Sequence, residues 1–542
     1  MKKIKIFAED IKTADISYFD YAKNKIDNYK DYPICKVGNK IVDLREKIEK
    51  DKEVEFLDIS YKWGNRTYTK TLSLVFAMAL NRLYPQIEAD LNHYIGAGLY
   101  IDFANRQGLR IEEIEKIKKE MDDIIAANYE IKTYTVSKNE AIEIFKDKNP
   151  EIIRLLSTIE EDIDVGICQC QELIDINYSI LAPTTGYISS YKLMNYYPGL
   201  LLISPNIKNN FDASNYKEMP KLAKVFQDST DHYKLLGLNK LADINEKILS
   251  GQAKKIMQIS DAIFTKKIMD IASKIHNDKD IKMVLISGPT SSGKTTFTGK
   301  LKIYLEALGY STIMISMDDY FVDREKTPLD KNGEFDFESP YAVDLDLFNK
   351  DMYRLLNQEK IYKREFDFLT GLGMYKDEEI VPDGHTIIMI EGIHALNPLI
   401  SKLIPEKNKY KVYISALNQV NLDSHNRVST TDGRLIRRSV RDHNFRGYSI
   451  EETFKMWDNI GKAEEKYIFP FQEKADALIS SSLPYESAVL KKHIVPMLET
   501  IEEDSEYYSE ARNVLETLKY VVSIDDDKLV SSESLLREFI GD

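Results

Sequence analysis

One segment restricts the fold more than any other. An apolar run, Met283 to Ile286, leads almost directly into the octapeptide Gly-Pro-Thr-Ser-Ser-Gly-Lys-Thr, which begins at Gly288. The octapeptide fits G-x-x-x-x-G-K-[ST], in which two glycines let the backbone curl so that successive N–H groups point at a polyphosphate. A helix that begins after the loop would add the positive end of its dipole. We therefore predict a strand, a phosphate-binding loop (P-loop) and a helix, with a nucleoside triphosphate bound near residue 290.

Two side chains of this loop have expected roles of their own. Lys294 can reach the β and γ oxygens of the nucleotide, and the hydroxyl of Thr295 can ligate Mg²⁺. ATP and Mg²⁺ are therefore the expected cofactors. The residues expected to bind the nucleotide here are Gly288, Pro289, Thr290, Ser291, Ser292, Gly293, Lys294, Thr295 and Thr296.

Length and composition predict a multidomain protein of the cytoplasm. A chain of 542 residues is long enough for three or four domains, and none of its apolar runs reaches the roughly 18 residues that cross a bilayer. The first ten residues have too short an apolar stretch for a signal peptide. The three cysteines lack the spacing of a zinc site, and a net charge of −14 opposes broad attraction to nucleic acid.

Changes in pattern along the chain suggest five segments. The helical periodicity is clearest from Ile111 to Ala127, and a second helix is expected from Thr71 to Leu83. A break at Gly237 interrupts an otherwise helical, charged stretch. The expected segments are a small β-rich module (1–62), an α+β domain (63–214), a helical connector (215–280), an α/β P-loop domain (281–487) and a helical tail (488–542).

The P-loop domain alternates apolar strand-like runs with helical patterns. The runs are Met283 to Ile286, Ser311 to Ser316, Thr386 to Ile390 and Lys411 to Ile414. This alternation predicts a mostly parallel sheet with flanking helices, in which ligands lie at the carboxyl ends of the strands. Asp318 follows the second run and Glu391 the third. We expect both carboxylates to face the Mg²⁺ and the γ-phosphate.

Phosphoryl transfer also requires a base for the acceptor hydroxyl and neutralisation of phosphate charge. Asp318 is the candidate base. Arg434, Arg438 and Arg441 would share one face of a helix, so their guanidinium groups could converge on one anion as a lid over the phosphates. The alternative is a solvated basic face that pairs with acids such as Asp442.

The motifs of this region, in their order, resemble the uridine kinase and phosphoribulokinase group of P-loop kinases. Besides the P-loop, the resemblance lies in Ser316 to Phe321 (SMDDYF), Phe335 to Pro340 (FDFESP), Phe366 to Phe368, Ile390 to Ile393 (IEGI) and Arg437 to Asp442 (RRSVRD). It implies catalytic roles for Asp318, Lys294, Arg438 and Arg441, metal binding by Thr295, Asp318 and Glu391, and a lid contact from Arg446. The substrate-binding positions it implies are Asp318, Tyr320, Glu338, Phe366, Asp367 and Arg438.

This sequence departs from uridine kinases on the acceptor side. Glu338 stands where an Asp usually grips the ribose hydroxyls, and the motif at Phe366 lacks the usual Tyr and the His that reads the pyrimidine. About twelve extra residues, roughly Asn418 to Thr430, precede the expected lid. Because unpaired buried polar groups are costly, losing such partners weakens the expectation of uridine itself as substrate. Phosphorylation of a small hydroxyl compound, of the nucleoside type, remains the prediction.

The front half has its own resemblance. Residues 32–60 resemble the later part of a TGS domain, and residues 66 to about 203 resemble the second N-terminal domain of threonyl-tRNA synthetase. The histidine and cysteine pairs with which that domain clears mischarged tRNA would fall near Lys70, Leu74, Asn177 and Leu181, none of which can replace them. His93 is expected to satisfy a local hydrogen bond. We therefore expect a scaffold without catalysis that binds a regulator, RNA or another subunit.

Two classes of function stay open. In the first, the chain is a nucleoside-type kinase with a regulatory front half, acting as an oligomer of identical subunits without a membrane partner. In the second, it is a nucleotide-switched factor that binds RNA or protein and hydrolyses ATP slowly. A candidate base and a full arginine lid favour the first, because a switch needs no base for an acceptor.

Overall fold

The computed structural model describes residues 4–7, 16–49, 52–104, 108–330 and 333–541. At its N-terminal end, the strands β1 (Ile4–Phe7), β2 (Ile34–Val37), β3 (Lys40–Val42) and β4 (Glu53–Leu57) form an antiparallel sheet in the order β1-β4-β2-β3. Helix α1 (Tyr18–Lys25) packs on this sheet through the buried ring of Tyr18. The β-rich character expected for this region is confirmed.

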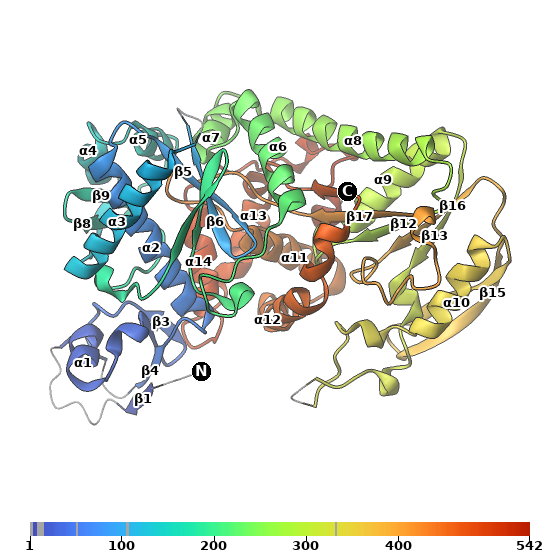
Figure 1. The fold of residues 1–542 in the computed structure, drawn as a ribbon, viewed down its shortest axis with the longest axis horizontal. Coiled ribbons are helices and arrows are strands. Elements are labelled where there is room, and N and C mark those ends of the chain that lie inside the picture. Colours follow the sequence, from blue (N-terminus) through green and yellow to red (C-terminus); the bar gives the residue numbers. More distant parts are fainter. Residues whose placement is uncertain (1–3, 8–15, 50–51, 105–107, 331–332, 542) are drawn as a thin grey trace.

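A second α+β part follows, built around two antiparallel sheets. One sheet has the order β10-β11-β6-β5 and the other β7-β8-β9. Helices α2 and α3 pack against each other beside the first sheet (Figure 1). The elements are α2 (Lys62–Leu83), β5 (Ala89–Ile95), β6 (Gly98–Phe103), α3 (Ile111–Ala127), β7 (Lys132–Ser137), α4 (Lys138–Phe145), α5 (Pro150–Ser157), β8 (Asp164–Cys170), β9 (Leu173–Ile176), β10 (Lys192–Tyr196) and β11 (Gly199–Ile203).

Three helices connect this half to the next: α6 (Pro220–Leu236), α7 (Leu241–Leu249) and α8 (Ala253–Asn277). Gly237 ends α6 with a φ of 58°, a left-handed conformation that glycine adopts without strain. Helix α8 runs along the upper side of the molecule in Figure 1 and packs against α9. Gly237 thus ends a helix where the sequence shows a break.

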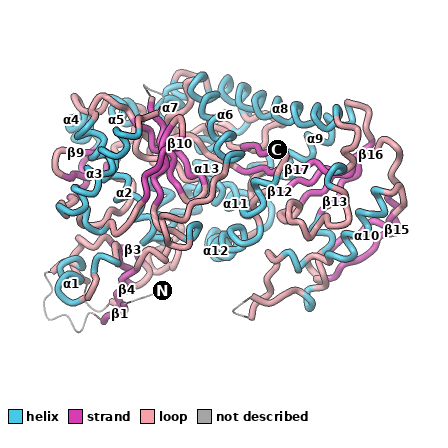
Figure 2. Tube along the Cα trace, in the orientation of Figure 1, coloured by secondary structure: helices cyan, strands magenta, loops and turns pink. Residues whose placement is uncertain are grey.

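The next part is a five-stranded, all-parallel sheet in the order β13-β16-β12-β17-β18. Figure 2 shows it surrounded by helices, with the hairpin of β14 and β15 at the far side of the molecule. The elements are β12 (Met283–Ser287), α9 (Lys294–Ala307), β13 (Ser311–Ser316), α10 (Leu345–Leu356), β14 (Ile361–Asp367), β15 (Leu372–Ile380), β16 (Thr386–Glu391), β17 (Lys409–Ser415), α11 (Thr430–Arg446), α12 (Ile450–Tyr467) and β18 (Ala477–Ser480). The predicted α/β fold class is confirmed.

The tail contains α13 (Glu486–Glu499), α14 (Tyr508–Leu518) and α15 (Arg537–Ile540). Helices α13 and α15 both pack against α11. Apolar side chains of the tail, the connector and the parallel sheet belong to one continuous core, which includes Phe264, Val284 and Leu536. The tail is therefore an integral layer of the C-terminal half.

A loop between β17 and α11, residues 416–429, reaches into the α+β part, and we call it the interdomain loop. Its Ser424 carbonyl accepts a hydrogen bond from the backbone N–H of Leu91 (2.7 Å), and Asn421 donates to Asn92 (2.7 Å). The extra residues noted in the sequence thus join the two halves.

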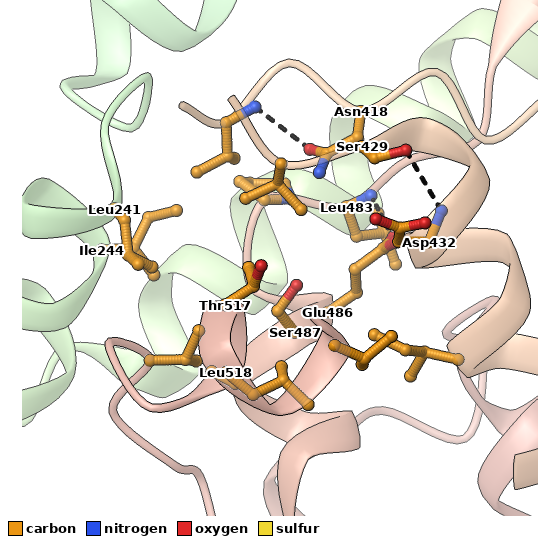
Figure 3. A pocket seen from close by; sticks show the side chains of 17 residues that line it. Leu241, Ile244, Asn418, Ser429, Asp432, Leu483, Glu486, Ser487, Thr517 and Leu518 are labelled. Atoms are coloured by element: carbon orange, nitrogen blue, oxygen red, sulfur yellow. Dashed lines mark hydrogen bonds between the residues drawn. The ribbon is translucent and has the colours of Figure 1, made fainter. Parts of the chain in front are cut away.

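A small cavity of about 20 Å³ lies where the interdomain loop meets α7, α11, α13 and α14. Figure 3 shows Leu241, Ile244, Leu483 and Leu518 around it, with Asp432 at the start of α11 bonded to Ser429. A cavity of this size holds about one water molecule. It is a packing defect at the joint and contains no P-loop residue. Among the described residues, no helix is long and apolar enough to cross a bilayer.

Candidate active site

The P-loop curls because two of its positions exclude a side chain. A Cβ on Gly288 would lie 2.0 Å from the carbonyl oxygen of Ile414, and Gly293 has a φ of 82°. Helix α9 begins at Lys294, directly after the loop, as predicted. The ammonium group of Lys294 donates to the carbonyls of Gly288 (3.1 Å) and Pro289 (3.2 Å), so it lies across the mouth of the loop.

Helices α11 and α12 hold the loop from outside. Glu464 accepts a hydrogen bond from the backbone N–H of Thr290 (3.0 Å), and Arg434 donates to the carbonyl of the same residue (3.1 Å). Arg434 and Glu464 also form a buried ion pair. Arg437, fully buried, donates to the carbonyl of Ser291 (3.4 Å). These groups fix the loop from side chains more than 140 residues away, which is why local sequence patterns did not indicate Glu464.

The two acids that follow neighbouring strands lie at the same sheet edge. Ser316 of β13 is in register with Glu391 of β16, and Asp318 lies two residues beyond Ser316. Desolvation by the surrounding protein raises the pKa of both carboxyl groups, although the side chain of Asp318 remains open to solvent. The positive charge of Lys294 lowers the pKa of both groups, and the negative charge of Asp318 raises the pKa of Glu391. Lys294, Asp318 and Glu391 therefore share one electrostatic environment.

Glu338 belongs to the same environment. Desolvation, followed by repulsion from Glu464, raises its pKa to about 7, while Arg438 and Lys294 oppose the shift. The imidazole of His394, three residues after Glu391, is buried beside the Glu338 backbone, and burial lowers its pKa to about 4. A neutral imidazole thus lies next to the candidate acceptor side of the site. The sequence analysis did not single out His394.

The arginines of α11 divide into two groups. Arg438 donates to the hydroxyl of Thr290 (2.9 Å) and pairs with Asp442 (3.1 Å). Arg441 (3.1 Å) and Arg446 (3.3 Å) pair with the same fully buried carboxylate. These three guanidinium groups meet at Asp442, the partner named in the alternative interpretation, and their contact with phosphate stays a prediction. Arg434 does not join them, because it is engaged by Glu464 and Thr290.

Three residues that the resemblance assigns to acceptor binding make other contacts in the structure. Tyr320 is buried in the core, where its hydroxyl donates to Asp351 (3.1 Å), so the expected contact with substrate is corrected to a structural role. The carboxylate of Asp367 accepts from Leu369 and Thr370 within its own turn. Phe366 is buried in an aromatic cluster with Phe321 and Phe368. The backbone of Phe366 also bonds to the carboxyl group of Asp319, next to Asp318.

The donor atoms at the sheet edge suit a triphosphate and a hard cation. The hydroxyls of Ser291 and Ser292 are buried in the loop without a partner among the described residues. Thr295 is exposed at the start of α9, one residue after Lys294, whose charge acts on both carboxylates. Mg²⁺ prefers oxygen ligands of this kind and often keeps one or two carboxylates plus phosphate oxygens. The residues therefore fit the expected group.

Polar groups of the α+β part bond to the interdomain loop. Lys70 donates to the carbonyl of His425 (3.2 Å), and the ring of His425 bonds to Asp175 (2.7 Å). Leu74 and Leu181 are buried in the core, and Asn177 takes part in β-sheet-like backbone bonding with Gly166. His93 stacks on Phe226 with ring centroids 3.6 Å apart, and burial lowers its pKa well below the usual value. Stacking on Phe226 and Tyr100 thus holds this ring in the core, and the expected local hydrogen bond stays a prediction.

Comparison with known proteins matches the two halves separately. The chain is 32% identical over 161 residues to the threonine–tRNA ligase of Caldanaerobacter subterraneus subsp. tengcongensis, covering 30% of this chain and 25% of the ligase. It is 33% identical over 158 residues to threonine–tRNA ligase 2 of Bacillus subtilis, with 29% and 25% covered. The chain thus spans about a quarter of the length of these relatives, and the match falls in the N-terminal region.

Two of the similar solved structures are kinases by their titles. A possible uridine kinase from Bacillus stearothermophilus is 20% identical with a TM-score of 0.27, covering 40% of this chain and 98% of that one. D-glycerate 3-kinase from Cryptococcus neoformans is 13% identical with a TM-score of 0.22, covering 48% and 87%. The model of the phosphoribulokinase / uridine kinase family matches residues 283–486. The C-terminal half therefore contains a P-loop kinase domain of the phosphoribulokinase / uridine kinase family, joined to a region similar to part of the threonine–tRNA ligases.

Proposed function

We propose that the protein is an ATP- and Mg²⁺-dependent small-molecule kinase. It transfers the γ-phosphate to a hydroxyl of a nucleoside, of the uridine or cytidine type, or of a related small sugar-containing acceptor. One observation carries the proposal: Lys294, Asp318, Glu391 and Glu338 share an electrostatic environment at the carboxyl edge of a parallel sheet, beside the P-loop.

The phosphate side of the reaction uses the loop and the sheet edge. Backbone N–H groups of residues 290–296 and the ammonium group of Lys294 would hold the phosphates. Thr295, Asp318 and Glu391 would hold Mg²⁺, which supplies charge neutralisation between the phosphates when it is bound. Arg438, Arg441 and Arg446 can exchange part of their pairing with Asp442 for phosphate oxygens, because they already surround one anion.

The acceptor side uses Asp318 and Glu338. Asp318 follows β13 and is open to solvent, so its carboxylate can take the proton of an acceptor hydroxyl as the phosphoryl group is transferred. Glu338 can hydrogen-bond a second hydroxyl, and its raised pKa lets it do so as either an acid or a carboxylate. Two neighbouring hydroxyls are the feature shared by ribonucleosides and small sugars.

A direct screen tests this function. The protein is incubated with ATP, Mg²⁺ and single nucleosides or small sugar alcohols, and mass spectrometry detects an acceptor heavier by one phosphate. ADP that forms only with a phosphorylated acceptor supports the proposal, and Lys294→Ala, assayed in parallel, should abolish the product. Slow ADP release at the same rate with every acceptor and without any would instead support a nucleotide-switched binding factor.

The N-terminal half completes the proposal as a region without catalysis. Its positions equivalent to the editing residues carry a lysine bonded to His425, two core leucines and an asparagine. We propose that it regulates or binds, with RNA as one candidate ligand. Incubation with mischarged tRNA should give no deacylation above the buffer rate.

A further inference from the structure

The C-terminal tail lies against the P-loop. A carboxylate oxygen of Glu538 accepts a hydrogen bond from the hydroxyl of Thr296 (2.7 Å) and another from its backbone N–H (3.2 Å). Leu535 covers Gly293, since a Cβ on that glycine would lie 2.5 Å from a methyl carbon of the leucine. One side chain of the tail is therefore bonded to the first turn of α9, and another covers the loop.

Packing holds this segment in place. Leu535, Leu536 and Phe539 are all at most 1% exposed, and the guanidinium group of Arg437 lies 5.2 Å from the ring centre of Phe539. Ser534 bonds to Asp261 (3.0 Å), and Asn444 of α11 donates to the Phe539 carbonyl (3.1 Å). The carboxylate of Glu538 thus reaches Thr296 from a buried, well-anchored backbone.

The groups that Glu538 engages are anion-binding groups. The N–H of Thr296 lies in the first turn of α9, where backbone N–H groups have no partner within the helix itself and the helix dipole favours negative charge. A phosphate oxygen of a nucleotide in the P-loop would use the same donor. Glu538 is also one of the negative charges that raise the pKa of Glu391, which places it near the proposed metal ligands.

We propose that residues 531–541 form an intrasteric gate over the nucleotide site. Glu538 takes the place of a phosphate on Thr296 and Leu535 covers Gly293, so a nucleoside triphosphate binds fully only after Glu538 turns away or the segment lifts. Because Asn444 and Arg437 of α11 hold the same segment, opening of the gate is tied to the position of the lid helix. This inference rests on the proposed function, since it requires the P-loop to bind a triphosphate.

The test measures ATP affinity by calorimetry in the full-length protein. Glu538→Gln removes the competing charge and Glu538→Ala also removes the hydrogen bonds, so ATP should bind about tenfold more tightly to the alanine variant and by a smaller factor to the glutamine variant. Glu503→Gln is the matched control. Glu503 also belongs to the tail and pairs with Lys40 (3.5 Å), but it is exposed and lies outside residues 531–541. Its affinity should equal that of the wild type.

Hydrogen exchange gives a second readout that does not depend on a substitution. Amides of residues 534–541 should exchange faster in the wild type when ATP is added, and unchanged or slower exchange would contradict the gate. Equal ATP affinity in the wild type and both Glu538 variants overturns the gate while leaving the kinase proposal intact. Failure of all of them to bind ATP, with normal thermal melting, overturns both.

Discussion

Both halves of the molecule gather charged side chains, but the charges are arranged differently. In the α+β half, Lys240 lies between Asp90 (2.6 Å) and Glu151 (3.1 Å), and Asp175 holds His425 of the interdomain loop. In the kinase domain, desolvation raises the pKa of Glu391 and Glu338, and the nearby charge of Asp318 raises both further. Buried charges that are paired off belong to structure, whereas acids kept close together at a P-loop are positioned for a cation and a substrate.

The largest expected effect is on the kinase side. Asp318→Asn should lower kcat by about 10³-fold while ATP binding persists, because the amide keeps the shape but cannot accept the hydroxyl proton. Steady-state kinetics and calorimetry separate the two quantities. Asp319→Asn is the control, since the Phe366 backbone engages that carboxyl group, and its kcat should stay within about threefold. Near-normal turnover of Asp318→Asn would remove the contrast between the halves.

The α+β side should respond in stability and not in chemistry. Lys240→Met leaves Asp90 and Glu151 without their cation and should lower the free energy of unfolding by about 3 kcal/mol, with kcat unchanged. Urea titration measures the loss. Lys266→Met, which removes an exposed pair with Asp270, should cost less than about 0.5 kcal/mol. A loss of kcat in the folded Lys240 variant would mean that this network takes part in catalysis.

The joint between the halves should weaken as the solution becomes alkaline. Burial lowers the pKa of His425, but the charge and hydrogen bond of Asp175 outweigh it, so the net shift is upward. The stability of this pair is then complete below pH 6.5, the unfolded pKa, and is lost as pH rises through the higher folded pKa. The difference in unfolding free energy between the wild type and His425→Asn should shrink by about 1.5 kcal/mol across that range. A constant difference from pH 6 to 9 would show that His425 is neutral in the fold.

The smallest expected effect tests whether Tyr320 lies outside the active site. Tyr320→Phe removes the hydrogen bond to Asp351 and should cost about 1 kcal/mol of stability. The KM of the acceptor should not change, because the ring lies in the core. A several-fold rise in KM with unchanged melting would restore Tyr320 to the acceptor site.

Local patterns predicted the parts of the fold that local physics determines. The strand at Ser311–Ser316 and the helix at Ile111–Ala127 have the boundaries expected from their periodicity. Helix α2, however, begins at Lys62 instead of the expected Thr71. Its first turns are too polar to show a helical stripe, and they are stabilised by the other half, as in the ion pair of Arg66 with Asp432.

For the candidate site, too, local sequence patterns predicted some residues and missed others. The P-loop residues and the acids after β13 and β16 follow from motif and strand order, and the structure places them together. Residues that hold the loop from a distance, such as Glu464 and Glu538, have no local signal, because their roles depend on which helices pack beside it. The implied role of Tyr320 failed since motif similarity does not report which way a side chain points.

The interdomain loop has a consequence for how this polypeptide can be divided. The two halves contact each other at more than one place. The kinase domain extends residues 416–429 into the α+β part, and Ser509 of α14 accepts a hydrogen bond from the backbone N–H of Ile41 in β3 (2.8 Å). A gene cut near residue 280 would yield fragments with mutually exposed charges, Asp175 on one and His425 on the other. We therefore expect that recombination separating the two halves would destabilise both, so that they are inherited as a single unit.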